Sequence, residues 1–321
     1  MGLLFLSYAA VACVVVFVSI KCADYVDLID KKTNMSGAFI GGVILAAVTS
    51  LPELITSITA VTVVKNPGLI MGNVLGSNVF NLLIFGVLCF FTMKSFVTKS
   101  ISKSHKITII CTLVAYAVVI AVMNFDYAVL GVSYGSVLIL ILYIVSLKFM
   151  ASDDSENDEE DTSKLTLKQI IIRFILAAIM LVIGSVLITY ITDKIATGLN
   201  LNASLAGALF LGIATSLPEL SSSVALVKKR NYNAMTGNIM GSNMFNYLIL
   251  VVGDILYNKE SIFVISASHQ TNMLIVFGAI SSVATLITLF THSSKKKSKP
   301  VLYIFTGVII ISYILFLVFS M

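Results

Sequence analysis

Two near-copies of one polar motif lie within long apolar stretches of this 321-residue chain. Residues 49–54 and 215–220 both read TSLPEL, and residues 72–81 (GNVLGSNVFN) closely match residues 237–246 (GNIMGSNMFN). The copies are offset by 166 residues over the first block and by 165 over the second, so the loop between the blocks differs by one residue. This duplication predicts a fold made of two related halves.

Each copy places a glutamate in the middle of an apolar stretch, where a charged side chain is costly. Of the 16 Asp and Glu residues, only Glu53 and Glu219 lie midway along such stretches. An ionisable residue at this depth in a bilayer indicates a functional site by default. The two glutamates are therefore the primary candidates for a binding site.

The composition indicates an integral membrane protein. The chain is 58% hydrophobic and 12% charged, whereas a soluble domain is roughly 25% charged. Apolar stretches of about 20 residues, the length that spans a bilayer, predict an all-α protein with ten transmembrane helices. The first stretch lacks a basic start and a small-residue cleavage site, so we interpret it as a helix and not as a signal peptide. The expected helices cover residues 2–20, 36–63, 68–92, 107–124, 127–149, 169–192, 203–227, 233–257, 271–291 and 301–320.

The basic residues predict the orientation of these helices. With the N-terminus outside, 18 of the 21 Lys and Arg residues fall in cytoplasmic loops, and only Lys65, Lys194 and Lys259 fall on the other side. By the positive-inside rule, both termini are expected outside. The two motif copies lie in the second and seventh expected helices, an offset of five, so the second copy enters the membrane from the opposite side. The predicted fold is therefore two inverted-topology five-helix repeats, an organisation of secondary transporters.

An acidic segment joins the two predicted halves. The first half covers residues 1–150, the linker residues 151–167 and the second half residues 168–321. Within the linker, residues 153–161 form a run of carboxylates that is too polar to bury. We interpret it as a cytoplasmic tether, and a Ca²⁺-sensing role is the alternative.

Prolines next to the two glutamates predict broken helices. Pro52 and Pro218 each remove a backbone donor and clash with the carbonyl of residue i−4, here Val48 and Ala214. Irregular backbone at membrane depth survives only where it is buried in protein or lines a cavity. Carbonyl, hydroxyl and carboxylate oxygens would then gather at one depth, and such hard ligands suit Na⁺ or Ca²⁺.

The second helix of each repeat adds a hydroxyl and an amide. Ser77 and Asn81 are i and i+4 apart, as are Ser242 and Asn246, so each pair shares one helical face. The other amides of these helices either join helices, which we favour, or bind ions, and their glycines permit close packing. These amides are Asn73, Asn78, Asn238 and Asn243, and the glycines are Gly72, Gly76, Gly237 and Gly241.

The charge of the site favours exchange. With both glutamates ionised, one Ca²⁺ would neutralise them, and Na⁺ ions could do so in its place. A single site that binds either Ca²⁺ or Na⁺, but not both at once, is the simplest arrangement that allows antiport. A channel instead needs several weak binding sites in single file. The sequence therefore predicts an antiporter and not an enzyme, and a Ca²⁺-permeable channel is the alternative from another class.

The paired motifs in inverted halves resemble the alpha-repeats of the calcium/cation antiporter superfamily, in particular the prokaryotic sodium/calcium exchangers. The likeness covers the ten-helix plan, with specific motifs at about 36–90 and 202–256. It implies exchange of Ca²⁺ for Na⁺ by alternating access. It also implies that the first and sixth helices slide against a core of the second, third, seventh and eighth.

The resemblance further implies a ligand set. Its two carboxylates would be shared by Ca²⁺ and Na⁺, the serines of the second helices would hold Na⁺, and the asparagines would complete the site. The implied ligands are Glu53, Glu219, Thr49, Ser50, Thr215, Ser216, Ser77, Ser242, Asn81 and Asn246, with the carbonyl oxygens of Ala46 and Gly212 as further candidates.

One departure from the family pattern concerns the coupling ion. Relatives that include potassium-dependent exchangers carry Asp where Asn246 stands here. Asn at this position argues against K⁺ as a co-substrate. The Gly-Asn-Ala-Thr-Glu-like hallmark of the proton-coupled branch is absent from both repeats. A desolvated glutamate can nevertheless bind a proton, so H⁺-coupled exchange of Ca²⁺ or another divalent cation is the alternative to Na⁺ coupling.

The remaining features suggest no further partner class. The four cysteines lack paired spacing, so we interpret them as packing residues and not as a metal site or disulfide framework. We expect no cofactor besides the transported ions Ca²⁺ and Na⁺, no nucleic acid and no obligate protein partner. The expected location is a prokaryotic plasma membrane, with the acidic loop in the cytoplasm.

Overall fold

The computed structural model describes residues 1–33, 35–63, 65, 68–129, 131–153, 165–199, 214–257, 260–266, 268–294 and 297–320. Within these residues the fold is helical apart from one short hairpin. The elements are α1 (Gly2–Lys32), α2 (Gly37–Phe39), the π-helix η1 (Ile40–Leu45), α3 (Ala46–Thr49), α4 (Leu51–Thr62), α5 (Gly68–Phe91), α6 (Met93–Phe96), α7 (Ser104–Asn124), β1 (Ala128–Val129), β2 (Val132–Ser133), α8 (Tyr134–Ala151), α9 (Leu167–Gly198), α11 (Leu217–Lys228), α12 (Tyr232–Tyr257), α13 (Ile262–Ile265), α14 (His269–Ser293) and α15 (Lys299–Ser320).

The transmembrane helices agree with the predicted plan. Eight described helices are long and apolar enough to cross a membrane, and the bent pair Gly37–Thr49 and Leu51–Thr62 makes up to nine. The remaining predicted helix, at residues 203–227, begins among residues 200–213, which lie outside the described part of the chain. Its described portion is α11, which carries the second TSLPEL motif.

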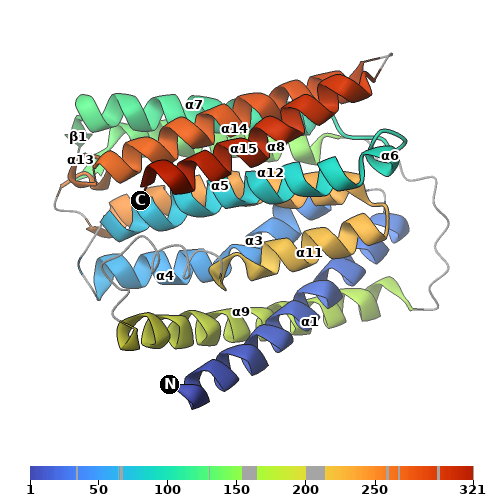
Figure 1. Ribbon diagram of the computed structural model, residues 1–321, viewed down its shortest axis with the longest axis horizontal. Coiled ribbons are helices and arrows are strands. Elements are labelled where there is room, and N and C mark those ends of the chain that lie inside the picture. The colour runs from blue at the N-terminus through green and yellow to red at the C-terminus, as the bar shows by residue number, and fades with distance from the viewer. Residues whose placement is uncertain are drawn as a thin grey trace.

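The helices form layers that place the motif-bearing segments in the middle (Figure 1). Helices α1 and α9 pack along each other on one side, and α7, α8, α14 and α15 lie on the other. Between them lie the broken helix α3–α4, α11, α5 and α12, with buried apolar side chains such as Leu75, Phe85 and Ile239 packed around them. The layering therefore buries both motif copies.

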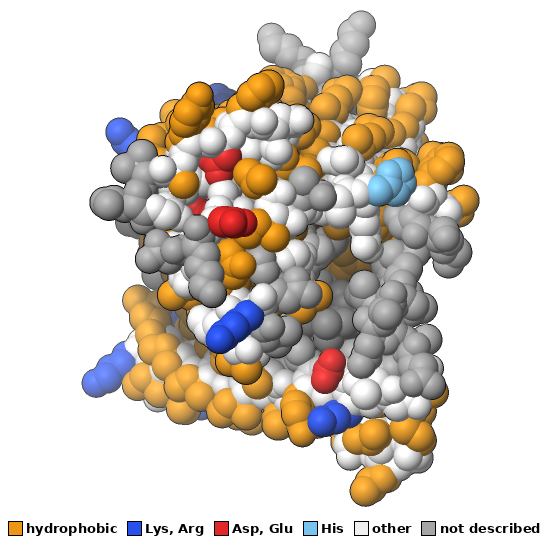
Figure 2. Space-filling model, turned by 90° about the vertical axis from the view of Figure 1, so that its left-hand side faces the viewer, with side chains coloured by type: hydrophobic (Ala, Val, Ile, Leu, Met, Phe, Trp, Pro, Cys, Tyr) orange, Lys and Arg blue, Asp and Glu red, His pale blue; other side chains and the backbone are white. Residues whose placement is uncertain are grey.

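Both chain termini lie at the same end of the molecule (Figure 1), as an even number of spans requires. Figure 2 looks onto that end and shows scattered Lys and Arg side chains among hydrophobic and polar ones. A sparse basic surface is what the positive-inside rule expects of the outer side. The outward orientation of the termini stays a prediction.

The first helix is longer than predicted. It runs to Lys32 and not to residue 20, because its last turns carry acidic side chains that find partners on the turn between α11 and α12. The Asn231 side-chain amide donates to Asp27 Oδ1 at 3.0 Å and to Asp30 Oδ2 at 2.8 Å. A prediction from hydropathy alone places the end of the helix too early, because the charged residues of the last turns form hydrogen bonds with a residue about 200 positions away.

The fifth predicted helix begins later than residue 127. Ala128 pairs with Ser133 in the hairpin β1–β2, and Gly131 between the strands has a φ of 81°, a conformation that favours glycine. Helix α8 then starts at Tyr134, and Ser133 Oγ accepts from the Gly135 N–H at 3.0 Å as its cap.

The described ends of the acidic linker are anchored to helices. Asp153 Oδ2 accepts from the Ser104 N–H at 3.3 Å at the start of α7, and Thr166 caps α9. Residues 154–164 lie outside the described part of the chain. The tether interpretation therefore stays a prediction.

If the segment is only a tether, replacing the acidic residues within 154–161 by serine should leave the expected Ca²⁺ transport within about twofold of wild type, because a tether needs its length and not its charges. The substitution keeps the linker length and Asp153. Transport in sealed vesicles, measured over a range of internal Ca²⁺, checks this. Loss of a Ca²⁺-dependent activation in the serine variant would show that the segment senses Ca²⁺.

Candidate cation-binding site

Both TSLPEL motifs lie at breaks in the helical backbone. Between α3 and α4, Ser50 has φ −92° and ψ 5°, and the two helices meet at a bend of 42°. Ser216 has nearly the same angles, φ −91° and ψ 9°, at the start of α11. Pro52 and Pro218 lie in the first turns that follow, where a missing N–H leaves no intrahelical bond unmade. The predicted breaks are confirmed, and they lie two residues before the prolines.

The breaks place the two motif glutamates in the centre of the protein. Glu53 and Glu219 lie in the first turns of α4 and α11, and each is 1% exposed. Ser50 Oγ donates to Glu219 Oε1 at 3.1 Å, which connects the break of one repeat with the carboxylate of the other. Thr215 and Ser77 are polar neighbours of the Glu53 carboxylate.

Neither glutamate forms an ion pair with a Lys or Arg of the described residues, where the ion pairs include those of Lys21, Lys31 and Lys229. The two carboxylates also lie close enough to repel each other. A buried carboxylate without a compensating cation is strongly unfavourable. The arrangement therefore requires a positive charge that the described side chains do not supply.

A threonine of the first break reaches across to α12. The Thr49 hydroxyl lies 3.4 Å from both Asn238 Oδ1 and Ser242 Oγ, and it donates to the Ala46 carbonyl at 3.2 Å. The Ala46 carbonyl also accepts from the Ser50 N–H at 3.0 Å. It thus already accepts two hydrogen bonds, and an ion at this oxygen would have to replace one of them.

The amides of α5 and α12 form crossed pairs between the repeats. Asn81 Nδ2 donates to Asn243 Oδ1 at 3.1 Å, and Asn246 Nδ2 donates to Asn78 Oδ1 at 2.9 Å. The repeat offset of 165 residues relates one pair to the other. The contact between α5 and α12 is therefore symmetric about the site.

The remaining two asparagines join helices within each repeat. Asn73 Nδ2 donates to Ser57 Oγ at 3.1 Å, and Asn238 Nδ2 donates to Ser223 Oγ at 3.1 Å. This supports the interpretation of these asparagines as links between helices. The partner serines were not predicted, although their spacing of 166 residues is a signal that the sequence carries.

Several buried oxygen atoms of the implied ligands make no hydrogen bond within the described residues. Buried polar atoms in proteins are almost always satisfied, and a group of buried oxygen atoms that make no hydrogen bond is a suitable environment for a cation. These atoms are Glu53 Oε1 and Oε2, Glu219 Oε2, Ser77 Oγ, Ser216 Oγ, Asn81 Oδ1 and Asn246 Oδ1.

The structure thus brings residues of both motif copies to one place, on α3, α4, α5, α11 and α12. Thr215 and Ser216 lie at the second break, with both side chains fully buried. Gly212, whose carbonyl was a further candidate, lies outside the described part of the chain.

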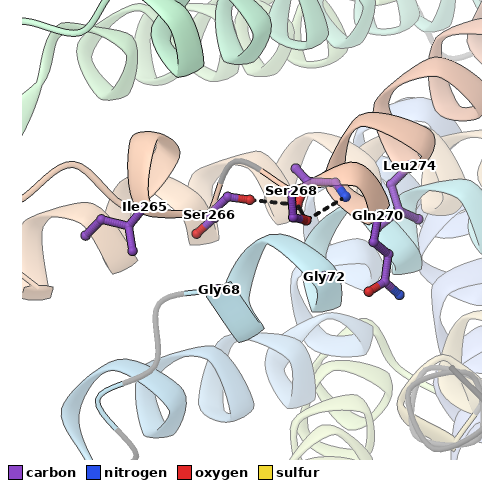
Figure 3. A pocket seen from close by; sticks show the side chains of 8 residues that line it. Gly68, Gly72, Ile265, Ser266, Ser268, Gln270 and Leu274 are labelled. Atoms are coloured by element: carbon purple, nitrogen blue, oxygen red, sulfur yellow. Dashed lines mark hydrogen bonds between the residues drawn. The ribbon is translucent and has the colours of Figure 1, made fainter. Parts of the chain in front are cut away.

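A pocket of about 160 Å³ lies apart from these residues (Figure 3). It is formed between the start of α5, with Gly68 and Gly72, and the segment that enters α14. The hydroxyls of Ser268 and Thr271 bond to each other at 2.9 Å. None of the implied ligands and no ionisable side chain lines this pocket, so we assign it no part in cation binding.

Asn246→Asp should make the expected transport more dependent on pH than in the wild type. A third carboxylate would ionise against the repulsion of two others, so H⁺ should compete with the cations, and exchange should fall several-fold with each unit of acidification. K⁺ dependence is a second expected change. Transport assays across neutral pH, with and without K⁺, check both. Profiles identical to wild type would show that residue 246 does not face the ions.

The comparisons with known proteins cover both halves of the chain. A family model described as sodium/calcium exchanger protein matches residues 2–151 and 169–321. An uncharacterized membrane protein (MJ0091) of Methanocaldococcus jannaschii is 30% identical over 219 residues, 67% of this chain and 69% of that protein. The putative antiporter CaxA of Alkalimonas amylolytica is 30% identical over 234 residues, 71% of this chain and 73% of that protein.

Solved structures with the same architecture are also known. The sodium-calcium exchanger NCX_Mj, from crystals soaked with 2.5 mM Na⁺ and 10 mM Sr²⁺, matches with a TM-score of 0.73 and 25% identity. The match covers 99% of this chain and 99% of that one.

Proposed function

Because the chain belongs to the sodium/calcium exchanger family, we propose that it is a secondary active antiporter that exchanges Ca²⁺ for Na⁺. The transport site would be built around Glu53 and Glu219. One observation carries the proposal: buried carboxylate, hydroxyl and amide oxygens that make no hydrogen bond within the described residues lie where the two repeats meet, and no described Lys or Arg pairs with the carboxylates.

The donor set suits the proposed ions. Ca²⁺ takes six to eight oxygen ligands in a flexible geometry, and the site offers oxygens of three chemical kinds. Two carboxylates match the charge of one Ca²⁺. Na⁺ ions bind the same class of oxygen, so they can neutralise the same carboxylates in place of Ca²⁺.

The burial of the glutamates favours obligatory exchange. When the site is closed to water on both sides, two carboxylates without a cation would repel each other in an environment of low polarity. Closing the site is therefore favourable only when cations are bound. A carrier that cannot switch from one side of the membrane to the other with an empty site must return with another cation, so it exchanges ions instead of releasing them in one direction.

Helices α1 and α9 are the proposed moving elements. They carry none of the implied ligands and form a layer of their own, which contacts the broken segments through α11, α3 and α4. Alternating access would follow if this layer changes its position while the crossed contacts of α5 and α12 stay intact. The proposed setting is a prokaryotic plasma membrane, with both termini outside.

The test is transport by the purified full-length chain in sealed vesicles. Vesicles loaded with Na⁺ and diluted into Na⁺-free medium should accumulate radiolabelled Ca²⁺ without ATP, and dissipating the Na⁺ gradient should stop the uptake. Parallel vesicles carry K⁺ or H⁺ gradients instead. Uptake driven by H⁺ alone would establish proton coupling, and uptake with a Ca²⁺ gradient and no counter-ion would establish a channel.

A further inference from the structure

The two asparagines of the proposed site can bind a cation at only one end. An Asn side chain has an acceptor oxygen and an NH₂ group with two donors. A half-turn of the amide would present the NH₂ of Asn81 or Asn246 to the ion and remove a ligand. The oxygen therefore needs a neighbour that selects its orientation.

For Asn81 the selection begins at a main-chain atom. Asn243 Nδ2 donates to the main-chain oxygen of Asn78 at 3.3 Å, and a carbonyl oxygen can only accept. The other end of the Asn243 amide is therefore the oxygen Oδ1, which accepts a hydrogen bond from Asn81 Nδ2 at 3.1 Å. This leaves Asn81 Oδ1 as the end without a hydrogen bond in the described structure.

For Asn246 the corresponding partner lies on the other repeat. Asn246 Nδ2 donates to Asn78 Oδ1 at 2.9 Å, which leaves Asn246 Oδ1 as the end without a hydrogen bond in the described residues. The four side chains are at most 1% exposed, so water does not compete for these donors. Each amide is thus bound by an asparagine of the opposite repeat. Asn243 is itself anchored at a main-chain oxygen, whereas Asn78 Nδ2 makes no hydrogen bond within the described residues.

We infer that Asn78 and Asn243 are positioning residues that hold the carbonyl ends of Asn246 and Asn81 toward the transported cation. This inference rests on the proposed function. Neither positioning residue contacts the ion itself, and each acts through one partner. Because both links cross between α5 and α12, the site keeps two of its oxygens only while the repeats remain in contact at this place.

Double-mutant cycles test the inference, because they show whether one residue acts through another. Asn243→Ala should raise the half-saturating Ca²⁺ concentration about fivefold, the effect of one typical hydrogen bond, with little change in maximal rate. In an Asn81→Ala background the same substitution should have no further effect, since no amide remains to be oriented. Asn78→Ala should behave in the same way toward Asn246→Ala.

The mixed pairs are matched controls. Asn78→Ala retains the main-chain oxygen that Asn243 binds, so the orientation of Asn81 should persist. The effects of Asn78→Ala and Asn81→Ala should therefore multiply, as should those of Asn243→Ala and Asn246→Ala. Should one cycle yield unfolded protein, as judged by size-exclusion chromatography, the symmetric cycle provides the same test.

The outcomes separate this inference from the proposed function. If Asn243→Ala raises the half-saturating concentration equally with and without the Asn81 side chain, and Asn78→Ala does so with and without that of Asn246, both act independently and the inference is wrong. Failure of the proposed function would appear in the wild-type protein, as Ca²⁺ uptake that requires no counter-ion gradient.

Discussion

Glu53→Gln and Glu219→Gln should each abolish Ca²⁺ uptake while the protein remains folded. The amide retains the shape of the side chain but removes the charge that compensates the lost hydration of Ca²⁺. Breaking a buried ion pair by removing one partner costs about 3–5 kcal/mol, and each 1.4 kcal/mol is tenfold in affinity. The loss should therefore exceed 100-fold in apparent affinity, an estimate that follows from about 3 kcal/mol.

Thermal unfolding in detergent separates loss of transport from loss of folding. Without added cations, each glutamine variant should be at least as stable as wild type, because it removes one of two repelling buried carboxylates. Glu260→Gln is the matched control, since Glu260 is exposed and should leave uptake unchanged. Near-normal uptake by either site variant would exclude that glutamate from the transport site.

The sequence predicts the centre of this protein well because the local chemistry there is unambiguous. A proline within an apolar span predicts an interruption of the helix, and both interruptions are found two residues before the prolines, at Ser50 and Ser216. The i, i+4 spacing of Ser77 and Asn81 follows from helical geometry alone. Repetition of these features in both halves indicates that they belong to one site.

The side-chain contacts between the two repeats could not be predicted from local sequence rules. The crossed bonds of Asn78 and Asn243 depend on how α5 meets α12, and the spacing of the asparagines along each helix is compatible with other partners. The two hydrogen bonds of the Ala46 carbonyl also arise from the geometry of the break itself. The sequence predicts that these polar groups lie at or near the site, but their hydrogen-bond partners depend on how the helices pack against each other.

Helix ends deviate for a related reason. The charged last turns of α1 look like a loop by hydropathy, yet they remain helical because Asn231 of the opposite half accommodates Asp27 and Asp30. Similarly, the apolar residues before Tyr134 look helical, but they form a hairpin that turns at Gly131. Tertiary partners in one case and backbone conformation in the other override the apolar pattern.

Gly241→Ala should strongly destabilise the protein or prevent its insertion. A Cβ atom at Gly241 would overlap the main-chain carbonyl of Gly42 in η1, and one at Gly237 would lie 2.8 Å from the Gly42 nitrogen. Main-chain atoms of packed helices cannot yield as a flexible side chain does, and overpacking costs about 1–3 kcal/mol or more. Because α12 also carries Ser242 and Asn246, any shift that relieves the overlap would displace the site.

Gly307→Ala is the control for the loss of a helical glycine as such. Gly307 lies in α15, where no described atom is within 4 Å of an added Cβ. Alanine favours a helix over glycine by about 1 kcal/mol, so this variant should unfold at the same temperature as wild type or slightly higher. The unfolding midpoint in detergent and Ca²⁺ uptake in vesicles are measured for both variants. If Gly241→Ala matches wild type in both, α12 and η1 do not approach at main-chain distance, and the glycines of the motif have another role.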